Sequence, residues 1–308
     1  LAPGAAYWLA VHQLDTDPDA GRAALDELVR RWPVSGYAWF ALERLGRRLP
    51  RRPEAEPPPL GALTQQAAMQ RAQALLSAGL DAWARQELGS VQATGRDQQL
   101  ALAWTWLEAG APAKAKKLAC PHAPKVGADG NAVAAQACTP RPERRLVEAV
   151  AARHGLDPAI PFGVMVAESA LKPEVTSPAG ARGLMQLMPE VGAERHADLF
   201  PGRPYDPDDL YIAPYNAALG TEELGQRRRS LQGLLEGTDV PAVVASYNGG
   251  EEAVRRWAGA FEGPAPFDAW AEAISYTETR RYVKRVLGYA MAVRWVYGDA
   301  DAEPSSGK

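Results

Sequence analysis

Glu168 is the residue of this sequence whose surroundings best suit a general acid. It lies near the C-terminal end of a predicted helix that begins at about residue 157 and runs to Ala170. Apolar residues of that helix fall on one face beside Glu168, and the negative end of the helix dipole is close by. Both disfavour an ionised carboxylate, and a protonated carboxylic acid can donate to a glycosidic oxygen. The alternative, from this segment alone, is a glutamate that extends into solvent from a frayed helix end.

Residues 177–189 carry a second set of groups suited to binding a sugar. They predict a turn followed by a short apolar stretch, and two glycines in the turn permit a close approach of the backbone to a bulky partner. Gln186 offers both a donor and an acceptor to a neutral polar ligand such as an N-acetyl sugar. Met185 and Met188 either line the same ligand or belong to the core.

Two further polar segments lie near the C-terminal end of the sequence. Residues 245–250 end one predicted helix and start another, and Tyr247 supplies a ring for sugar packing and a hydroxyl for hydrogen bonding. Residues 276–283 open the last predicted helix. Thr277 and the arginines that follow it do not form a capping box, so helix capping does not explain why this segment is so polar.

Together and in this order, these segments resemble the catalytic domain of soluble lytic transglycosylases, which is similar to goose-type lysozyme. The resemblance covers about residues 142–298. It rests on four motifs in register, which are Glu-Ser at 168–169, Ser-Pro-x-Gly-Ala-x-Gly-Leu-Met-Gln-x-Met-Pro at 177–189, Ala-x-Tyr-Asn-x-Gly at 245–250 and Glu-Thr-Arg-x-Tyr-Val at 278–283.

The resemblance implies that Glu168 is the single catalytic acid/base and that the product ends in 1,6-anhydromuramic acid. Ser177 would orient Glu168 or the neighbouring N-acetylmuramyl group, and Tyr247 would lie beside the scissile bond. The full set of implied substrate-binding residues is Ser177, Met185, Gln186, Met188, Tyr247, Asn248, Glu278 and Tyr282. The implied substrate is the MurNAc-GlcNAc β-1,4 bond of peptidoglycan glycan strands.

Two features depart from the family's pattern. Val166 and Ala167 stand where an Arg or Arg-Gln usually precedes the catalytic Glu-Ser pair. An Asp-Pro-x-x-Asn run is usual between the second and third motifs, whereas here extra residues separate Asp206-Pro207 from Asn216. We therefore assign no cleft-lining residue in that segment.

The composition predicts an all-α protein with two domains. Ala, Leu, Arg, Glu and Gln dominate, and strand-like alternation is nearly absent. Residues 1–125 predict an α-superhelical domain of helix pairs, similar to that of the large soluble members of the family. Residues 140–300 predict the lysozyme-like catalytic domain. Between them, residues 120–142 read as a loop, and a proline-rich break falls at residues 50–61.

Charge, hydropathy and cysteine content limit the partners and the location. A net charge of −3 in 308 residues gives no reason to expect a nucleic-acid partner. No apolar run is long enough to span a bilayer, and no Cys/His spacing predicts a metal or cofactor site. The chain begins with Leu1, so we expect that any export signal has been removed. If the protein is exported, Cys120 and Cys138 form either a disulfide or two free thiols.

These observations favour a lytic transglycosylase of the periplasm or cell envelope, a location that rests on the family resemblance. One alternative is a goose-type lysozyme hydrolase on the same fold. Another is a non-catalytic scaffold that binds peptidoglycan or protein partners through the superhelix. The joint presence of the acidic, amide and tyrosine side chains of the four motifs favours an enzyme.

Overall fold

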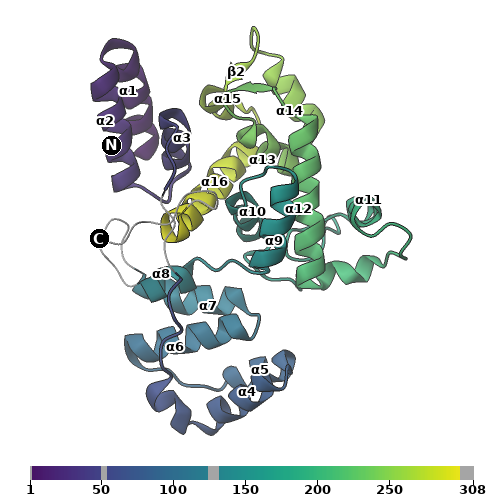
Figure 1. Cartoon of the computed structure of the whole chain (residues 1–308). Helices are drawn as coiled ribbons and strands as arrows, with labels where there is room; N and C mark the ends of the chain where they lie inside the picture. The colour runs from purple at the N-terminus through teal and green to yellow at the C-terminus, as the bar shows by residue number, and fades with distance from the viewer. Residues whose placement is uncertain (1, 50–53, 124–131, 299–308) are drawn as a thin grey trace. The chain divides into compact units, whose positions relative to one another are not determined.

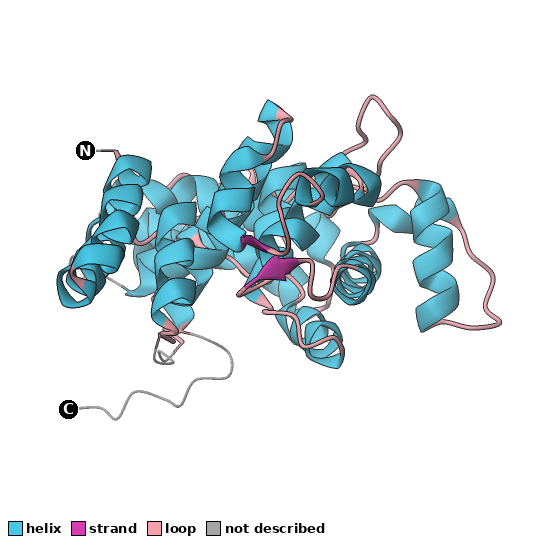
Figure 2. Cartoon of the chain, turned by 90° about the horizontal axis from the view of Figure 1, so that it is seen from above, coloured by secondary structure: helices cyan, strands magenta, loops and turns pink. Residues whose placement is uncertain are grey.

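The computed structural model describes residues 2–49, 54–123 and 132–298 of the chain. The regular secondary structure of these ranges is almost entirely helical, as the composition predicted (Figure 1). The sheet within them consists of β1 (Leu235–Glu236) and β2 (Ala265–Pro266), which pair in parallel (Figure 2). In these ranges, no helix is both long and apolar enough to cross a membrane.

The chain divides into two compact units. The smaller one contains the described residues between 54 and 142, and pairs of neighbouring helices pack around a core that includes Leu100, Ala103 and Trp106. Its elements are η1 (Gly61–Gln65), α4 (Ala67–Ser77), α5 (Asp81–Leu88), α6 (Gly95–Glu108), α7 (Pro112–Ala119), η2 (Cys120–His122) and α8 (Ala132–Cys138).

A disulfide between Cys120 and Cys138 joins the end of α7 to the end of α8, which decides between the two alternatives left open by the sequence. The expected loop at residues 120–142 was wrong in part, because α8 lies within it. Ala134 and Ala137 of this short helix are fully buried in the core of the unit. Residues 50–53 of the proline-rich break and residues 124–131 of the expected loop lie outside the described residues.

The larger unit contains the described residues up to 49 and those from 143 to 298. Its elements are α1 (Pro3–Thr16), α2 (Pro18–Arg31), α3 (Gly36–Leu45), α9 (Arg144–Arg153), α10 (Ala159–Ser169), α11 (Pro189–Leu199), η3 (Pro207–Tyr211), α12 (Ala213–Ser230), β1, α13 (Val240–Gly249), α14 (Glu251–Ala258), β2, α15 (Phe267–Ala273) and α16 (Thr277–Tyr297).

This division differs from the expected boundaries of 1–125 and 140–300, because the first three helices pack with the C-terminal half of the chain. A buried polar contact explains the difference. Asp268 is fully buried, accepts a hydrogen bond from the Tyr7 hydroxyl and forms an ion pair with Arg44 at 2.6 Å. A buried carboxylate needs such partners, and they come from helices more than 200 positions earlier in the sequence.

Helix α16 packs against both α3 and α10, and glycines make these close contacts possible. A Cβ at Gly36 of α3 would lie 2.9 Å from the backbone oxygen of Lys284. A Cβ at Gly163 of α10 would lie 2.5 Å from the backbone oxygen of Val286. Because backbone atoms cannot swing aside as flexible side chains do, the contact between α10 and α16 needs a residue without a side chain at position 163.

We therefore expect Gly163→Ala to lower the free energy of unfolding by about 1–3 kcal/mol, the usual range for overpacking a close contact. The matched control is Gly259→Ala, because a Cβ there would lie 3.4 Å from its nearest neighbour, the backbone oxygen of Arg255. Urea unfolding of the two variants provides the measurement. An equal and small effect of both substitutions would show that the helices can separate without loss of stability.

Candidate active site

Glu168 lies on the last turn of α10, half-buried, as the sequence predicted. The helix is mostly buried and ends at Ser169, and Ala170 takes a left-handed conformation with φ of 52°. The Ser169 hydroxyl donates to the backbone oxygen of Leu184 over 2.7 Å. The Glu-Ser motif therefore places the acid at the helix end and fixes that end to the following loop.

Tyr282 of α16 is a direct hydrogen-bonding partner of the Glu168 carboxyl group. Its side chain is 2% exposed, and its hydroxyl donates to Oε1 of Glu168 over 2.6 Å. The guanidinium carbon of Arg285 lies 5.6 Å from the centre of the Tyr282 ring, which is a cation–π distance. The motif that begins the last helix thus supplies a direct partner of the acid, and Arg285, which sequence reasoning missed, lies one turn of α16 beyond Glu278–Tyr282.

The surroundings of Glu168 favour its protonated form. Burial raises the pKa of its carboxyl group above the ordinary value, and the negative charge of Glu278 acts in the same direction. The hydrogen bond from Tyr282 and the positive charge of Arg285 oppose this shift without cancelling it. Glu168 therefore has the environment of a general acid, because partial desolvation favours a carboxyl group that keeps its proton.

The loop after α10 is held by its own side chains. The Ser177 hydroxyl accepts a hydrogen bond from the Ala181 N–H over 3.0 Å, and no hydrogen bond joins Ser177 to Glu168. The Gln186 amide nitrogen donates to the backbone oxygens of Val175 and Gly183, over 3.0 Å and 2.9 Å. Both side chains therefore fix the shape of the loop, and the amide nitrogen of Gln186 points toward the backbone of its own loop.

Asn216 of α12 anchors the same loop, although the sequence analysis left it unassigned. It is fully buried, accepts from the Met185 N–H over 2.7 Å and donates to the backbone oxygens of Arg182 and Leu210. A Cβ at Gly183 would lie 2.5 Å from the Asn216 amide nitrogen, and the φ of Gly183 is +80°. The extra residues between Asp206-Pro207 and Asn216 are the reason that the sequence analysis did not assign it. The available signal was the residue type, since an asparagine side chain can both donate to and accept from the backbone of a glycine-rich turn.

The two methionines of the loop lie in different environments. Met185 is fully buried, and its sulfur would lie 2.5 Å from a Cβ at Gly220 of α12. Met188 is 38% exposed at the start of α11. Tyr247, near the end of α13, donates its hydroxyl proton to the backbone oxygen of Met185 over 2.9 Å. Met185 thus packs the loop against α12, whereas the side chain of Met188 is accessible to solvent.

Asn248 and Glu278 are both exposed at neighbouring helix ends. The Thr279 hydroxyl donates to the Asn248 side-chain oxygen over 2.7 Å, which joins the end of α13 to the start of α16. The structure therefore brings α10, the 175–187 loop, α13 and α16 together around Glu168. In the described ranges, no group of three or more His, Cys, Asp or Glu side chains is arranged to hold a metal ion.

The sequence is similar to those of known proteins. Residues 145–266 match the family model of the transglycosylase SLT domain. The chain is 37% identical over 133 residues to the soluble lytic murein transglycosylase of Escherichia coli, and this match covers 43% of this chain and 20% of that protein. It is 35% identical over 115 residues to the membrane-bound lytic murein transglycosylase C of Actinobacillus pleuropneumoniae, and this second match covers 35% of this chain and 31% of that protein.

Solved structures show the same fold. The 70 kDa soluble lytic transglycosylase of Escherichia coli matches with a TM-score of 0.68 at 24% identity, over 95% of this chain and 46% of that one. An inactive mutant of the lytic transglycosylase Slt from Pseudomonas aeruginosa matches with a TM-score of 0.63 at 26% identity, over 94% and 46%. The chain thus spans less than half the length of these proteins.

The hydrogen bond from Tyr282 lowers the pKa of Glu168, so its removal has a predictable sign. We expect Tyr282→Phe to raise the pKa of the Glu168 carboxyl group further above its ordinary value. The measurement is an NMR titration of side-chain-labelled glutamate, with the Glu168 signal assigned from Glu168→Gln. The control is Tyr276→Phe, since Tyr276 is 50% exposed and bonds to no carboxylate among the described residues. An unchanged or lower pKa in Tyr282→Phe would contradict this electrostatic account.

Proposed function

We propose that this chain, whose residues 145–266 match the transglycosylase SLT domain, is a lytic transglycosylase that cleaves the glycan strands of peptidoglycan. The observation that carries the proposal is the half-buried Glu168, whose carboxyl pKa is raised and whose Oε1 accepts a hydrogen bond from Tyr282. The names of the similar proteins support the substrate class, since these relatives are murein transglycosylases.

The reaction begins with proton transfer from Glu168. Its protonated carboxyl donates to the glycosidic oxygen between MurNAc and GlcNAc, and the bond from that oxygen to C1 of MurNAc breaks. The developing positive charge at C1 is stabilised by the oxygen of the N-acetyl group of the same sugar, a substrate-assisted route that some glycosidases use. Glu168 is left as a carboxylate beside the sugar.

The second half of the reaction returns the proton. The Glu168 carboxylate takes the proton of the C6 hydroxyl of MurNAc, and the C6 oxygen bonds to C1 to close a 1,6-anhydro ring. No water is consumed, and Glu168 returns to its starting state. The C6 hydroxyl is tethered to the reacting sugar, so its effective concentration exceeds that of bulk water in the same position.

The local roles of other acidic residues favour ring closure over hydrolysis. A glycosidase with two carboxylates needs the second at about 5 Å for retention or roughly 6.5–9.5 Å for inversion. Asp206 accepts the Asp208 N–H as the cap of η3, and Asp208 forms an ion pair with Arg182 at 2.8 Å. These acids therefore have local roles in the loop. Glu278 raises the pKa of Glu168, a role consistent with framing the cleft.

We further propose that the exposed residues Met188, Asn248 and Glu278 contact the sugars, whereas Ser177, Met185 and Gln186 shape the loop that receives them. Tyr247 lies beside the scissile bond and Tyr282 orients the acid. The location would be the cell envelope, where peptidoglycan is found. Helix pairs outside residues 145–266 would position long strands or bind protein partners.

A goose-type hydrolase is the second candidate, because the same general acid on the same fold serves both reactions. The product separates them. We expect glycan strands digested by this chain to end in 1,6-anhydromuramic acid, with a mass one water lower than a hydrolysed end. Mass spectrometry of the digest provides the measurement. Predominantly reducing ends would contradict the transglycosylase and support the hydrolase.

We expect Glu168→Gln to abolish cleavage and leave the fold intact. Glutamine keeps the shape and accepts the Tyr282 hydrogen bond, but it cannot donate and recover a proton. General acid–base catalysis contributes about 10²- to 10⁴-fold, and the loss should reach or exceed the upper value for a sole acid/base. Glu278→Gln is the control, with a smaller loss. Near-normal turnover of Glu168→Gln on purified peptidoglycan would remove Glu168 from the mechanism.

A further inference from the structure

Tyr247 is held from two sides. Its hydroxyl donates to the backbone oxygen of Met185 over 2.9 Å, which fixes the ring to the loop that receives the substrate. The guanidinium carbon of Arg227 lies 5.7 Å from the centre of the ring. Arg227 is on α12, and no sequence motif described above includes it. An arginine at a cation–π distance from the ring restrains its position.

Arg227 also holds the backbone beside Tyr247. Its Nη1 donates to the backbone oxygen of Ser246 over 2.8 Å, near the C-terminal end of α13. Its Nε forms an ion pair with Oε1 of Glu223 at 2.7 Å, one turn earlier on α12. The side chain of Arg227 is 20% exposed. One guanidinium therefore contacts the ring of Tyr247, the preceding carbonyl and a carboxylate.

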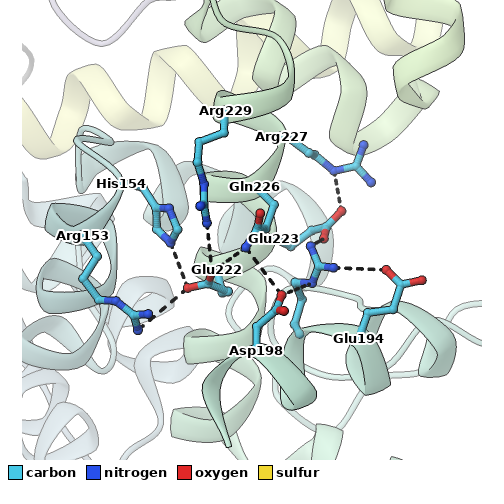
Figure 3. Close-up of polar contacts among 10 residues, drawn as sticks. Arg153, His154, Glu194, Asp198, Glu222, Glu223, Gln226, Arg227 and Arg229 are labelled. Atoms are coloured by element: carbon cyan, nitrogen blue, oxygen red, sulfur yellow. Dashed lines mark hydrogen bonds and ion pairs between the residues drawn. The ribbon is translucent and has the colours of Figure 1, made fainter. Parts of the chain in front are cut away.

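Glu223 lies between two arginines that come from different helices. It is 7% exposed, and Oε2 forms an ion pair with Arg195 of α11 at 3.1 Å. Arg195 in turn pairs with Glu194 and Asp198, each at 3.2 Å. Figure 3 shows this chain of dashed contacts from Glu194 through Glu223 to Arg227. The position of Arg227 is thus set by α11 and α12 together.

Stability alone is a weak reason for such an arrangement. Well-packed apolar residues in place of a buried ion pair often give equal or greater stability, because the charges lose their hydration. The described contacts give a second reason, since this series of ion pairs ends at the ring of Tyr247, whose hydroxyl holds the loop that follows α10. Burial and the charges of Glu168 and Glu223 raise the pKa of Tyr247, and the charge of Arg227 lowers it. The tyrosine therefore keeps its proton and remains a donor to the loop.

We propose that Arg227, anchored by Glu223 and Arg195, is a positioning residue that holds Tyr247 in the geometry that catalysis requires. This inference rests on the proposed function. Arg227 acts through Tyr247 and bonds to no reacting atom. Its removal would leave the ring and the end of α13 free to shift, which slows the chemical step more than it weakens substrate binding.

A double-mutant cycle tests the inference. The chains compared are the wild type, Arg227→Ala, Tyr247→Phe and the double variant, with kcat and KM measured on purified glycan strands. We expect Arg227→Ala to lower kcat on the order of tenfold, with KM changed by less than about twofold. In the Tyr247→Phe background, where the hydroxyl is already absent, the same substitution should lower kcat by less than about twofold.

The control is Arg229→Ala, because Arg229 is on the same helix with its side chain 59% exposed and lies 3.8 Å from Glu222. It should leave kcat unchanged. If Arg227→Ala does not fold, the pair Glu223→Gln with Arg227→Gln replaces it, since that pair leaves no buried charge without a partner, and the same cycle applies.

The possible failures are distinguishable. An equal loss of kcat with and without the Tyr247 hydroxyl would overturn the positioning role and leave the proposed function standing. A loss confined to KM would also overturn it. No cleavage of peptidoglycan by the wild-type chain would overturn the proposed function and this inference with it.

Discussion

The hydrogen bond from Tyr282 to Glu168 is the contact on which the candidate site depends. It joins the end of α10 to α16 over 2.6 Å, and it forms only because these helices approach closely. Gly163 permits that approach, since a side chain there would meet the backbone of Val286. The packing of two helices thus sets both the position of the acid and the balance between burial, which favours its proton, and hydrogen bonding, which favours its loss.

The rest of the site consists of supports around this contact. The Ser169 hydroxyl bonds the end of α10 to the loop at Leu184, and Asn216 of α12 accepts a hydrogen bond from the Met185 N–H of that loop. Tyr247 closes the loop from α13. None of these three side chains carries a net charge, so they add no charge to the partly desolvated surroundings of Glu168. A charged support, Arg227 with its partner Glu223, acts on Tyr247.

Local signals in the sequence predicted much of this structure. Asp17-Pro18 is such a local signal, since the Asp17 side chain accepts the Ala20 N–H at the start of α2. Apolar periodicity predicted α10 and placed Glu168 at its end. These predictions succeeded because helix caps and periodic apolar faces depend on residues close in sequence.

Long-range contacts could not be predicted in the same way. Nothing near Tyr7 or Arg44 indicates that both meet Asp268, so the sequence analysis grouped the first three helices with the residues that follow them. The substrate-binding role of Gln186 stays a prediction, and nothing in the sequence shows that its amide nitrogen donates to backbone oxygens of its own loop. Its positive φ of 52° is set by that loop, which residue type and spacing do not reveal.

A structure of Glu168→Gln with a bound glycan fragment tests the central claim most directly. If Glu168 is the general acid, the side-chain amide at position 168 will lie within about 2.6–3.2 Å of the glycosidic oxygen. The C6 hydroxyl of the MurNAc residue whose C1 carries that oxygen will face the same amide. A glycan bound with its MurNAc-GlcNAc linkage away from position 168 would contradict the claim.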